Sequence, residues 1–169
     1  MRYFHIIFLL ISIFLIQSCV VDEQCRQNKY VEMKVDFFHV KASAKRDTVT
    51  ISTLTIDSIT VRGLAYNVTT SKYEAKDSII YNDSKSVSTI DLPLHKLSTI
   101  SKYQIKLNAI TDTLTVVHTN TDSYLSLECG CLKFHTINSV ATTKHFVDSV
   151  SISNSNVNTS HAENIRIYK

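Results

Sequence analysis

The sequence predicts an all-β protein, an antiparallel β-sandwich of the immunoglobulin-like or Greek-key type. Segments that alternate apolar and polar residues recur along the chain, and β-branched and aromatic residues suited to half-buried strands are plentiful. No segment beyond the N-terminal leader shows a helical apolar stripe. A small closed β-barrel is the runner-up; it is less favoured because barrel corners usually need glycine, and the chain has only Gly63 and Gly130.

The N-terminal segment predicts export and lipid attachment. A short basic head, an apolar run over residues 6–16 and Ser18 before Cys19 are typical of a secretory signal peptide. This run is too short to span a bilayer, which takes about 20 residues as a helix. Residues 16–19 also resemble a bacterial lipobox, whose cysteine is acylated; the alternative is an ordinary cleaved signal that leaves Cys19 free. We expect a lipoprotein signal peptide at 1–18, a lipidated tether at 19–29 and one β-sandwich domain at 30–169.

The first predicted strand, Tyr30–Val40, places Val31, Met33, Val35 and Phe37 on one face. A five-residue unit then recurs, in which an Asp is followed by alternating hydroxyl and aliphatic residues. The Asp can close the preceding turn, so we interpret each unit as the opening of a strand. The units lie at residues 47–51, 57–61, 112–116 and 148–152.

The same alternation predicts the remaining elements in order. We expect strands at 86–92, 103–109, 132–137, 147–153 and 164–168, and a hairpin of 113–118 with 124–128 around a turn at 119–122. Residues 65–83 have no clean period and suggest a long, partly ordered connection. Pro93 should end a strand or lie at an edge. With so little glycine, Asn, Asp and Ser must form the turns.

Three cysteines remain if Cys19 is acylated. Outside the cytoplasm they can form disulfides, but a bridge between Cys129 and Cys131 would be strained. We expect Cys25 to pair with Cys129, with Cys131 as the alternative partner. Closing this loop would contribute about 3–5 kcal/mol in the chain-entropy description.

The residues that carry chemistry form no catalytic motif. Cys129, Cys131 and His135 supply three soft ligands in a short span, but structural zinc sites favour wider cysteine spacing and a fourth ligand. We therefore expect no metal and no cofactor. The histidines are scattered without close pairs, and we interpret them as surface or internally satisfied residues. Those after the expected signal peptide are His39, His95, His118, His135, His145 and His161.

The net charge and the aromatic residues indicate which classes of binding partner are expected. Removing residues 1–18 leaves 17 Lys and Arg against 15 Asp and Glu, a formal charge of +2, with the signs interspersed. This pattern gives no nucleic-acid footprint. Tyr66, Tyr73 and Tyr81 lie in the uncertain connection, where they form either a carbohydrate- or protein-binding patch or cover for the sandwich edge.

Short motifs together resemble a known group. After the lipobox cysteine come Asp22, Glu23, Cys25 and a long alternating strand, and the motifs Thr60–Leu64, Leu92–Leu94, Glu128–Gly130 and Glu163–Tyr168 follow. The chain is similar to uncharacterised lipoproteins of Bacteroidota that are catalogued as a domain of unknown function. The resemblance implies an envelope location and a β-rich domain, and it implies no activity.

Two further features resemble that lineage. Acidic residues directly after the lipobox cysteine resemble its signal for export to the cell surface. Asp-Ser/Thr-aliphatic triplets resemble its O-glycosylation acceptors, although the same triplets belong to the strand-opening pattern. The acceptor hydroxyls would be those of Thr48, Ser58, Ser78, Thr113 and Ser149.

The expected function is therefore that of a lipid-anchored outer-membrane protein on the periplasmic face or the cell surface. It would be a non-catalytic binding or assembly module, in contact with the membrane through its lipid and with an envelope protein or glycan. One alternative is a small apolar-ligand carrier with an interior pocket lined by Val, Ile and Phe. The other is an envelope metalloprotein or hydrolase that uses Cys129, Cys131 and His135.

Overall fold

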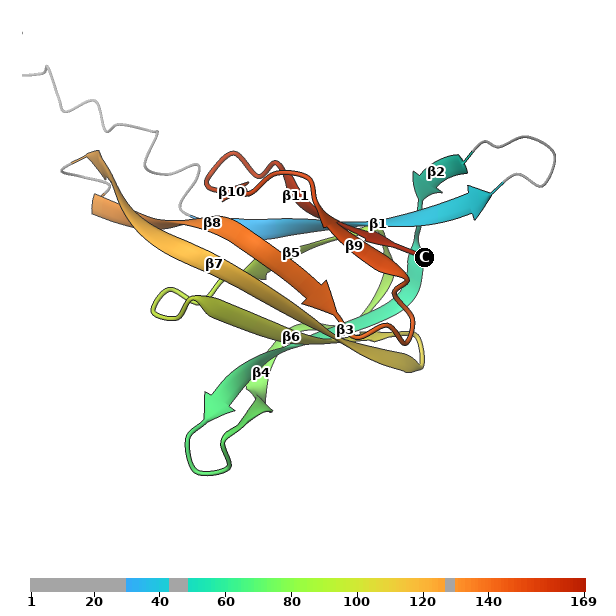
Figure 1. Cartoon of the computed structure of the whole chain (residues 1–169), viewed down its shortest axis with the longest axis horizontal. Coiled ribbons are helices and arrows are strands. Elements are labelled where there is room, and N and C mark those ends of the chain that lie inside the picture. The colour runs from blue at the N-terminus through green and yellow to red at the C-terminus, as the bar shows by residue number, and fades with distance from the viewer. Residues whose placement is uncertain (1–29, 43–48, 127–129) are drawn as a thin grey trace, which may run out of the picture.

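The computed structural model describes residues 30–42, 49–126 and 130–169, which fold into two β-sheets (Figure 1). The strands expected at 30–40, 47–51, 147–153 and 164–168 are present, with bounds of 32–42, 49–53, 149–152 and 163–168. The strands in chain order are β1 (Glu32–Ala42), β2 (Val49–Thr53), β3 (Ile56–Asn67), β4 (Lys72–Val87), β5 (Thr89–Pro93), β6 (Ile100–Leu107), β7 (Ile110–Ser126), β8 (Gly130–Thr142), β9 (Ser149–Ile152), β10 (Asn156–Val157) and β11 (Glu163–Tyr168).

The two sheets divide the chain unevenly. The first has the order β2-β1-β11-β9, with β5 also paired to β1, and the second has the order β10-β8-β7-β6-β3-β4. The sheets are not closed into a barrel, so the sandwich is confirmed and the runner-up barrel is wrong. Among the described residues, no helix is long and apolar enough to cross a membrane.

Strand β1 organises the first sheet. Its first half pairs with β5 and its second half with β2, both antiparallel, while β11 lies parallel to it on the other side. The parallel pair is an exception within a sandwich whose other pairs are antiparallel. It brings the beginning and the end of the described chain side by side (Figure 1).

The hydrophobic core lies between the two sheets. It is filled by the apolar side chains that the alternation of apolar and polar residues places on the inner face of each strand. Met33, Val35 and Phe37 of β1 are all 0% exposed. They pack in one cluster with apolar side chains from the second sheet, such as Ile59 and Leu114. Burial at about 25 cal/mol per Å² of apolar surface makes this cluster the main favourable contribution to folding.

Two local predictions are wrong. The expected turn at 119–122 lies inside β7, which pairs with β8 without interruption there. Its residues look turn-like because Thr119 and Thr121 face solvent, while Asn120 turns inward to a polar network. The expected connection at 65–83 is instead the β3–β4 hairpin. The register shifts in this pairing leave extra residues in β4, between Ala75 and Ser84, and these break the period of two that would have marked it as a strand.

Turn and edge expectations are confirmed. Ser71 and Asn108 adopt positive φ angles of 52° and 54° in the β3–β4 and β6–β7 turns, where glycine would be usual, whereas Asp83 and Ser86, with φ angles of 48° and 55°, lie inside β4. Pro93 ends β5.

The recurring Asp unit is only partly a strand opening. Asp112 lies inside β7 and is 2% exposed. Its carboxylate accepts hydrogen bonds from the backbone nitrogens of His145, Phe146 and Val147. It therefore fixes a distant loop, between β8 and β9, and not the turn just before it.

Candidate functional site

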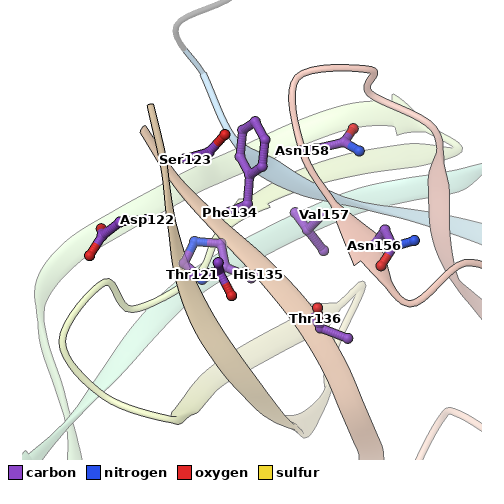
Figure 2. Close-up of a pocket in the computed structure, with 9 residues that line it drawn as sticks. All are labelled: Thr121, Asp122, Ser123, Phe134, His135, Thr136, Asn156, Val157 and Asn158. Carbon is purple, nitrogen blue, oxygen red and sulfur yellow. The ribbon is translucent and has the colours of Figure 1, made fainter. Parts of the chain in front are cut away.

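A polar depression, here named the β8 hollow, lies over β7, β8 and β10 and has a volume of about 290 Å³. Figure 2 shows the side chains that line it. They are Thr121, Asp122 and Ser123 of β7, Phe134, His135 and Thr136 of β8, and Asn156, Val157 and Asn158 of the segment that contains β10.

Strand register places five of these residues on one face of the second sheet. Thr121 is opposite Phe134, and Asn156 is opposite Thr136. Directly opposite residues share a face, as do residues two apart on one strand. The shared face therefore carries Thr121, Ser123, Phe134, Thr136 and Asn156.

The polar side chains of this face have no hydrogen-bond partners among the described residues. Among the described residues, none hydrogen-bonds to the hydroxyl groups of Thr121, Ser123 and Thr136 or to the side-chain amide of Asn156. By contrast, Asn158 Oδ1 accepts the backbone N–H of Ser160 at 2.9 Å. Four neighbouring polar groups are thus free to bond a ligand or water.

A buried polar network lies behind the hollow. Asn120 Oδ1 accepts hydrogen bonds from His118 Nδ1 at 2.8 Å and from His135 Nδ1 at 2.7 Å. Asn120 Nδ2 faces the backbone oxygens of His95, Lys96 and Ser98 at 2.9–3.2 Å. Since an amide nitrogen donates only, this orientation places a proton on Nδ1 of both rings.

Burial keeps both imidazoles neutral. The side chains of His118 and His135 are 0% and 3% exposed. Burial lowers the pKa of His118, and it lowers the pKa of His135 to about 4; the neighbouring His118 and the positive charges of Lys133 and Lys96 add to the effect on His135. At neutral pH each ring therefore has a proton on Nδ1 and an unprotonated Nε2 that can accept a hydrogen bond.

The network also contains a serine–histidine hydrogen bond like that of a serine hydrolase. Ser101 Oγ lies 2.9 Å from His118 Nε2 and donates to it. Ser101 Oγ in turn accepts the backbone N–H of His95 at 2.8 Å. A hydrolase histidine must also hand its proton to the leaving group, and His118 is 0% exposed. This geometry favours a structural role, in which the network fixes residues 95–98 to β6 and β7.

A second depression, here named the Gly63 groove, is mostly apolar and measures about 300 Å³. It lies between β3, β4, β6 and the segment after β5. Tyr103 closes one end by donating its hydroxyl to the Pro93 oxygen at 2.5 Å. Its floor is Gly63, where an added Cβ would lie 3.0 Å from Ser78 Oγ. The other lining residues are Leu64, Ala65, Ile80, His95, Ile100, Ser101 and Lys102.

The tyrosines of the β3–β4 hairpin differ in their surroundings, and the two predicted roles were a binding patch and cover for the sandwich edge. Tyr66 and Tyr73 form an edge-to-face pair with centroids 5.3 Å apart, and Lys102 Nζ lies 4.0 Å from the Tyr73 centroid. Tyr66 remains 53% exposed. Tyr81 packs against the core and accepts the Asp91 N–H, so it covers the edge of the sandwich.

Several predicted site residues lie outside the described residues, namely Cys19, Cys25, Thr48 and Cys129. Cys131 is described, exposed and, within the described part of the chain, has no disulfide partner. It pairs with Tyr124 beside a register shift next to Gly130, whose φ is 71°. The extra residue of this register shift lies on β7, between Tyr124 and Ser126.

The proposed glycosylation acceptors differ in exposure. Ser78 and Ser149 are exposed, whereas Ser58 and Thr113 are partly buried. Ser58 Oγ donates to the carboxylate of Asp83. Ser78 Oγ also donates to the Gly63 oxygen at 3.3 Å, so among the exposed acceptors only the Ser149 hydroxyl makes no hydrogen bond to another described residue.

The two described members of the proposed metal-ligand set, Cys131 and His135, do not come together in the fold. Cys131 and His135 lie on one extended strand, β8, four positions apart, which separates their Cα atoms by about 13 Å. Ligands of one zinc ion lie within about 2.3 Å of the metal, so these two do not share one here. The described residues contain no group of three or more His, Cys, Asp or Glu side chains that can hold a metal ion.

Comparison with known proteins places most of the fold in one family. Residues 58–169 match a family of unknown function, DUF6452. The chain belongs to this family. No curated protein and no solved structure matches it. The segment matched to DUF6452 contains every residue that lines the β8 hollow and the Gly63 groove.

The histidines have no close pairs in the sequence, but the fold brings two of them together. His118 and His135 lie with ring centroids 5.2 Å apart at an interplanar angle of 86°. Their separation in sequence conceals this, because the contact depends on the register of β7 with β8. One signal was available, since His118 and Asn120 are two apart and therefore share a face of any strand that contains both.

Proposed function

We propose that this protein is a lipid-anchored, non-catalytic binding module of the bacterial outer membrane, and that the β8 hollow is its ligand site. The observation that carries the binding role is the set of unused polar side chains around Phe134 on an open sheet face. Small-molecule sites typically combine a preformed depression with a few placed polar groups. The partner is an envelope protein or an envelope glycan.

The anchoring part of the proposal rests on the lipobox-like segment and on chain length. Two or more acyl chains at Cys19 give stable membrane attachment, whereas one chain is marginal. Residues 19–29 reach at most about 40 Å when fully extended, which keeps the sandwich near the bilayer. A Cys25–Cys129 disulfide, with Cys131 as the alternative partner, would shorten that reach. A Bacteroidota origin is part of the same proposal.

A two-part experiment in cells tests the proposed function. Metabolic labelling with an alkyne fatty acid should mark the wild-type protein in the outer-membrane fraction, and Cys19→Ala should abolish both the label and the membrane association. A photo-crosslinking residue at Thr121, in the hollow, should capture an envelope component. The same residue at exposed Ser149, on β9 of the other sheet, is the matched control. Unlabelled, soluble wild-type protein would contradict the anchor, and equal capture at both positions would contradict the site.

The Gly63 groove supports a second candidate, the carrier of a small apolar ligand. Its lining is mostly apolar, although it opens at the surface and is not the interior pocket that the sequence suggested. A fluorescent fatty acid should bind the wild-type protein, and Gly63→Leu, which fills the floor, should prevent binding. No binding by the wild-type protein would remove this candidate and leave the β8 hollow unaffected.

A further inference from the structure

We infer that the β8 hollow takes a neutral sugar ring, stacked on Phe134 and hydrogen-bonded by the polar residues of the same face. This inference deepens the proposed function and rests on it. The first support is chemical: Thr121, Ser123, Thr136 and Asn156 offer hydroxyl and amide groups that both donate and accept. A sugar presents hydroxyl groups of the same dual character, so each free group on this face has a complementary partner.

Phe134 supplies the apolar surface that a sugar also needs. It is the only aromatic six-carbon ring among the residues that line the hollow, and it is partly buried, which holds it in place. One face of a pyranose ring exposes mainly C–H groups, and aromatic faces pack well against such surfaces. The face around Phe134 thus offers a flat apolar ring for the C–H face of a sugar and hydrogen-bonding groups for its hydroxyl groups.

The charges around the hollow favour a neutral ligand. The five residues of the shared face carry no charge. Asp122, at the rim, forms an ion pair with Lys133 at 2.5 Å, so neither charge is free to select an ionic ligand. His135 stays neutral because its burial lowers its pKa to about 4. A uronic acid or an amine would therefore gain little here.

Geometry favours a sugar over an extended peptide. A peptide strand that adds to a sheet pairs with a strand edge, and at the hollow the edge of β8 pairs with β10 through Thr136 and His135 only. The hollow lies on a sheet face. Its volume of about 290 Å³ is at the lower end of small-ligand sites, which start near 300 Å³, and suits a single ring. The strands hold the face in place before binding, which reduces the entropy cost.

Saturation-transfer NMR on the full-length acylated protein in detergent micelles tests the inference. The probes are the methyl glycosides of glucose, galactose, mannose and N-acetylglucosamine, with methyl glucuronide as the charged comparison. At least one neutral glycoside should receive saturation. Phe134→Ala and Asn156→Ala should each weaken binding about tenfold, equivalent to 1.4 kcal/mol. Phe134→Tyr should retain binding because the ring face is kept. Ile51→Ala, which removes an exposed apolar side chain on β2 of the other sheet, is the matched control and should have no effect.

Each other result overturns the inference. These results are no transfer to any neutral glycoside, transfer that survives Phe134→Ala in a variant with wild-type thermal unfolding, or tighter binding of the glucuronide. If Thr121 crosslinks to a protein while no glycoside binds, the proposed function stands and the sugar inference fails. If neither crosslinking nor glycoside binding occurs, both fail.

Discussion

His118 and His135 donate their Nδ1 protons to the same oxygen, Oδ1 of Asn120, at 2.8 and 2.7 Å. One side-chain amide thereby orients two buried imidazoles and fixes their tautomers. Neither ring has a carboxylate partner in this network, so a proton added to either one would be buried without compensation. The shared acceptor makes the stability of the fold depend on pH.

The first prediction is a loss of stability in mild acid. The pKa of His135 is about 4 in the folded protein and near its ordinary value of 6.5 when unfolded. The unfolded chain therefore takes up a proton as the pH falls below 6.5, while the folded protein does not until about pH 4. The free energy of unfolding should be highest above pH 6.5 and should fall by about 3 kcal/mol toward pH 4. Urea unfolding across this range measures it.

A matched variant isolates the source of this dependence. His135→Gln lacks the titrating group and should show a flatter profile between pH 6.5 and 4. Part of the slope should remain, because burial also lowers the pKa of His118. A wild-type profile that is flat or rises as the pH falls through this range would contradict the assignment of neutral buried imidazoles.

The second prediction concerns Asn120. Asn120→Ala should cost about 2–4 kcal/mol, because it leaves buried imidazole N–H groups and backbone oxygens without partners. Asn120→Asp should instead raise the pKa of His135, since a carboxylate favours the imidazolium. Urea unfolding measures the first effect and NMR titration of the imidazole protons the second. Asn138→Ala, at an exposed position of β8, is the control. An unchanged pKa of His135 in Asn120→Asp would refute the hydrogen-bond assignment.

The third prediction concerns the buried carboxylate of Asp112. Burial alone would raise its pKa, but the backbone N–H groups of His145, Phe146 and Val147 and the hydroxyl of Thr143 lower it below the ordinary 3.8. The charged form is therefore stabilised by folding, and this contribution is present above pH 3.8 and lost as the pH falls through the lower folded value.

Two substitutions at Asp112 should differ in cost. Asp112→Ala leaves the backbone N–H groups of the loop unpaired and should cost about 3 kcal/mol or more. Asp112→Asn keeps one acceptor oxygen and should cost less. Asp148→Asn, at an exposed position, should change the free energy of unfolding by less than about 0.5 kcal/mol. Equal effects at positions 112 and 148 would show that the carboxylate does not fix the loop.

The fourth prediction concerns the floor of the Gly63 groove. Ala at position 63 would place its Cβ 3.0 Å from Ser78 Oγ, the end of a rotatable side chain. Rotation of that hydroxyl relieves the contact, and removing glycine from a strand lowers the entropy lost on folding. Gly63→Ala should therefore raise the free energy of unfolding by up to about 1 kcal/mol. Thermal unfolding of Gly63→Ala with and without Ser78→Ala checks it. A loss of stability that Ser78→Ala does not relieve would mean that backbone geometry, and not this contact, limits the position.

Local sequence patterns predicted much of the fold because they record which face of each strand is buried. The alternation around Met33, Val35 and Phe37 identified β1 and its inward side chains. The shortage of glycine predicted that residues such as Ser71 and Asn108 would adopt left-handed turn conformations. The same patterns failed where an inward polar residue mimicked a turn, as at Asn120, and where extra residues in β4 removed the period of two.

The sequence by itself determined the fold class, the inward faces of several strands and the residues that form turns, since each depends on neighbours close in the chain. Only the tertiary structure decided that β11 lies parallel to β1, that His118 and His135 meet at Asn120, and that Thr121, Phe134 and Asn156 share one open face. These relationships depend on strand register and order. Contacts between segments distant in sequence set both, so no local pattern records them.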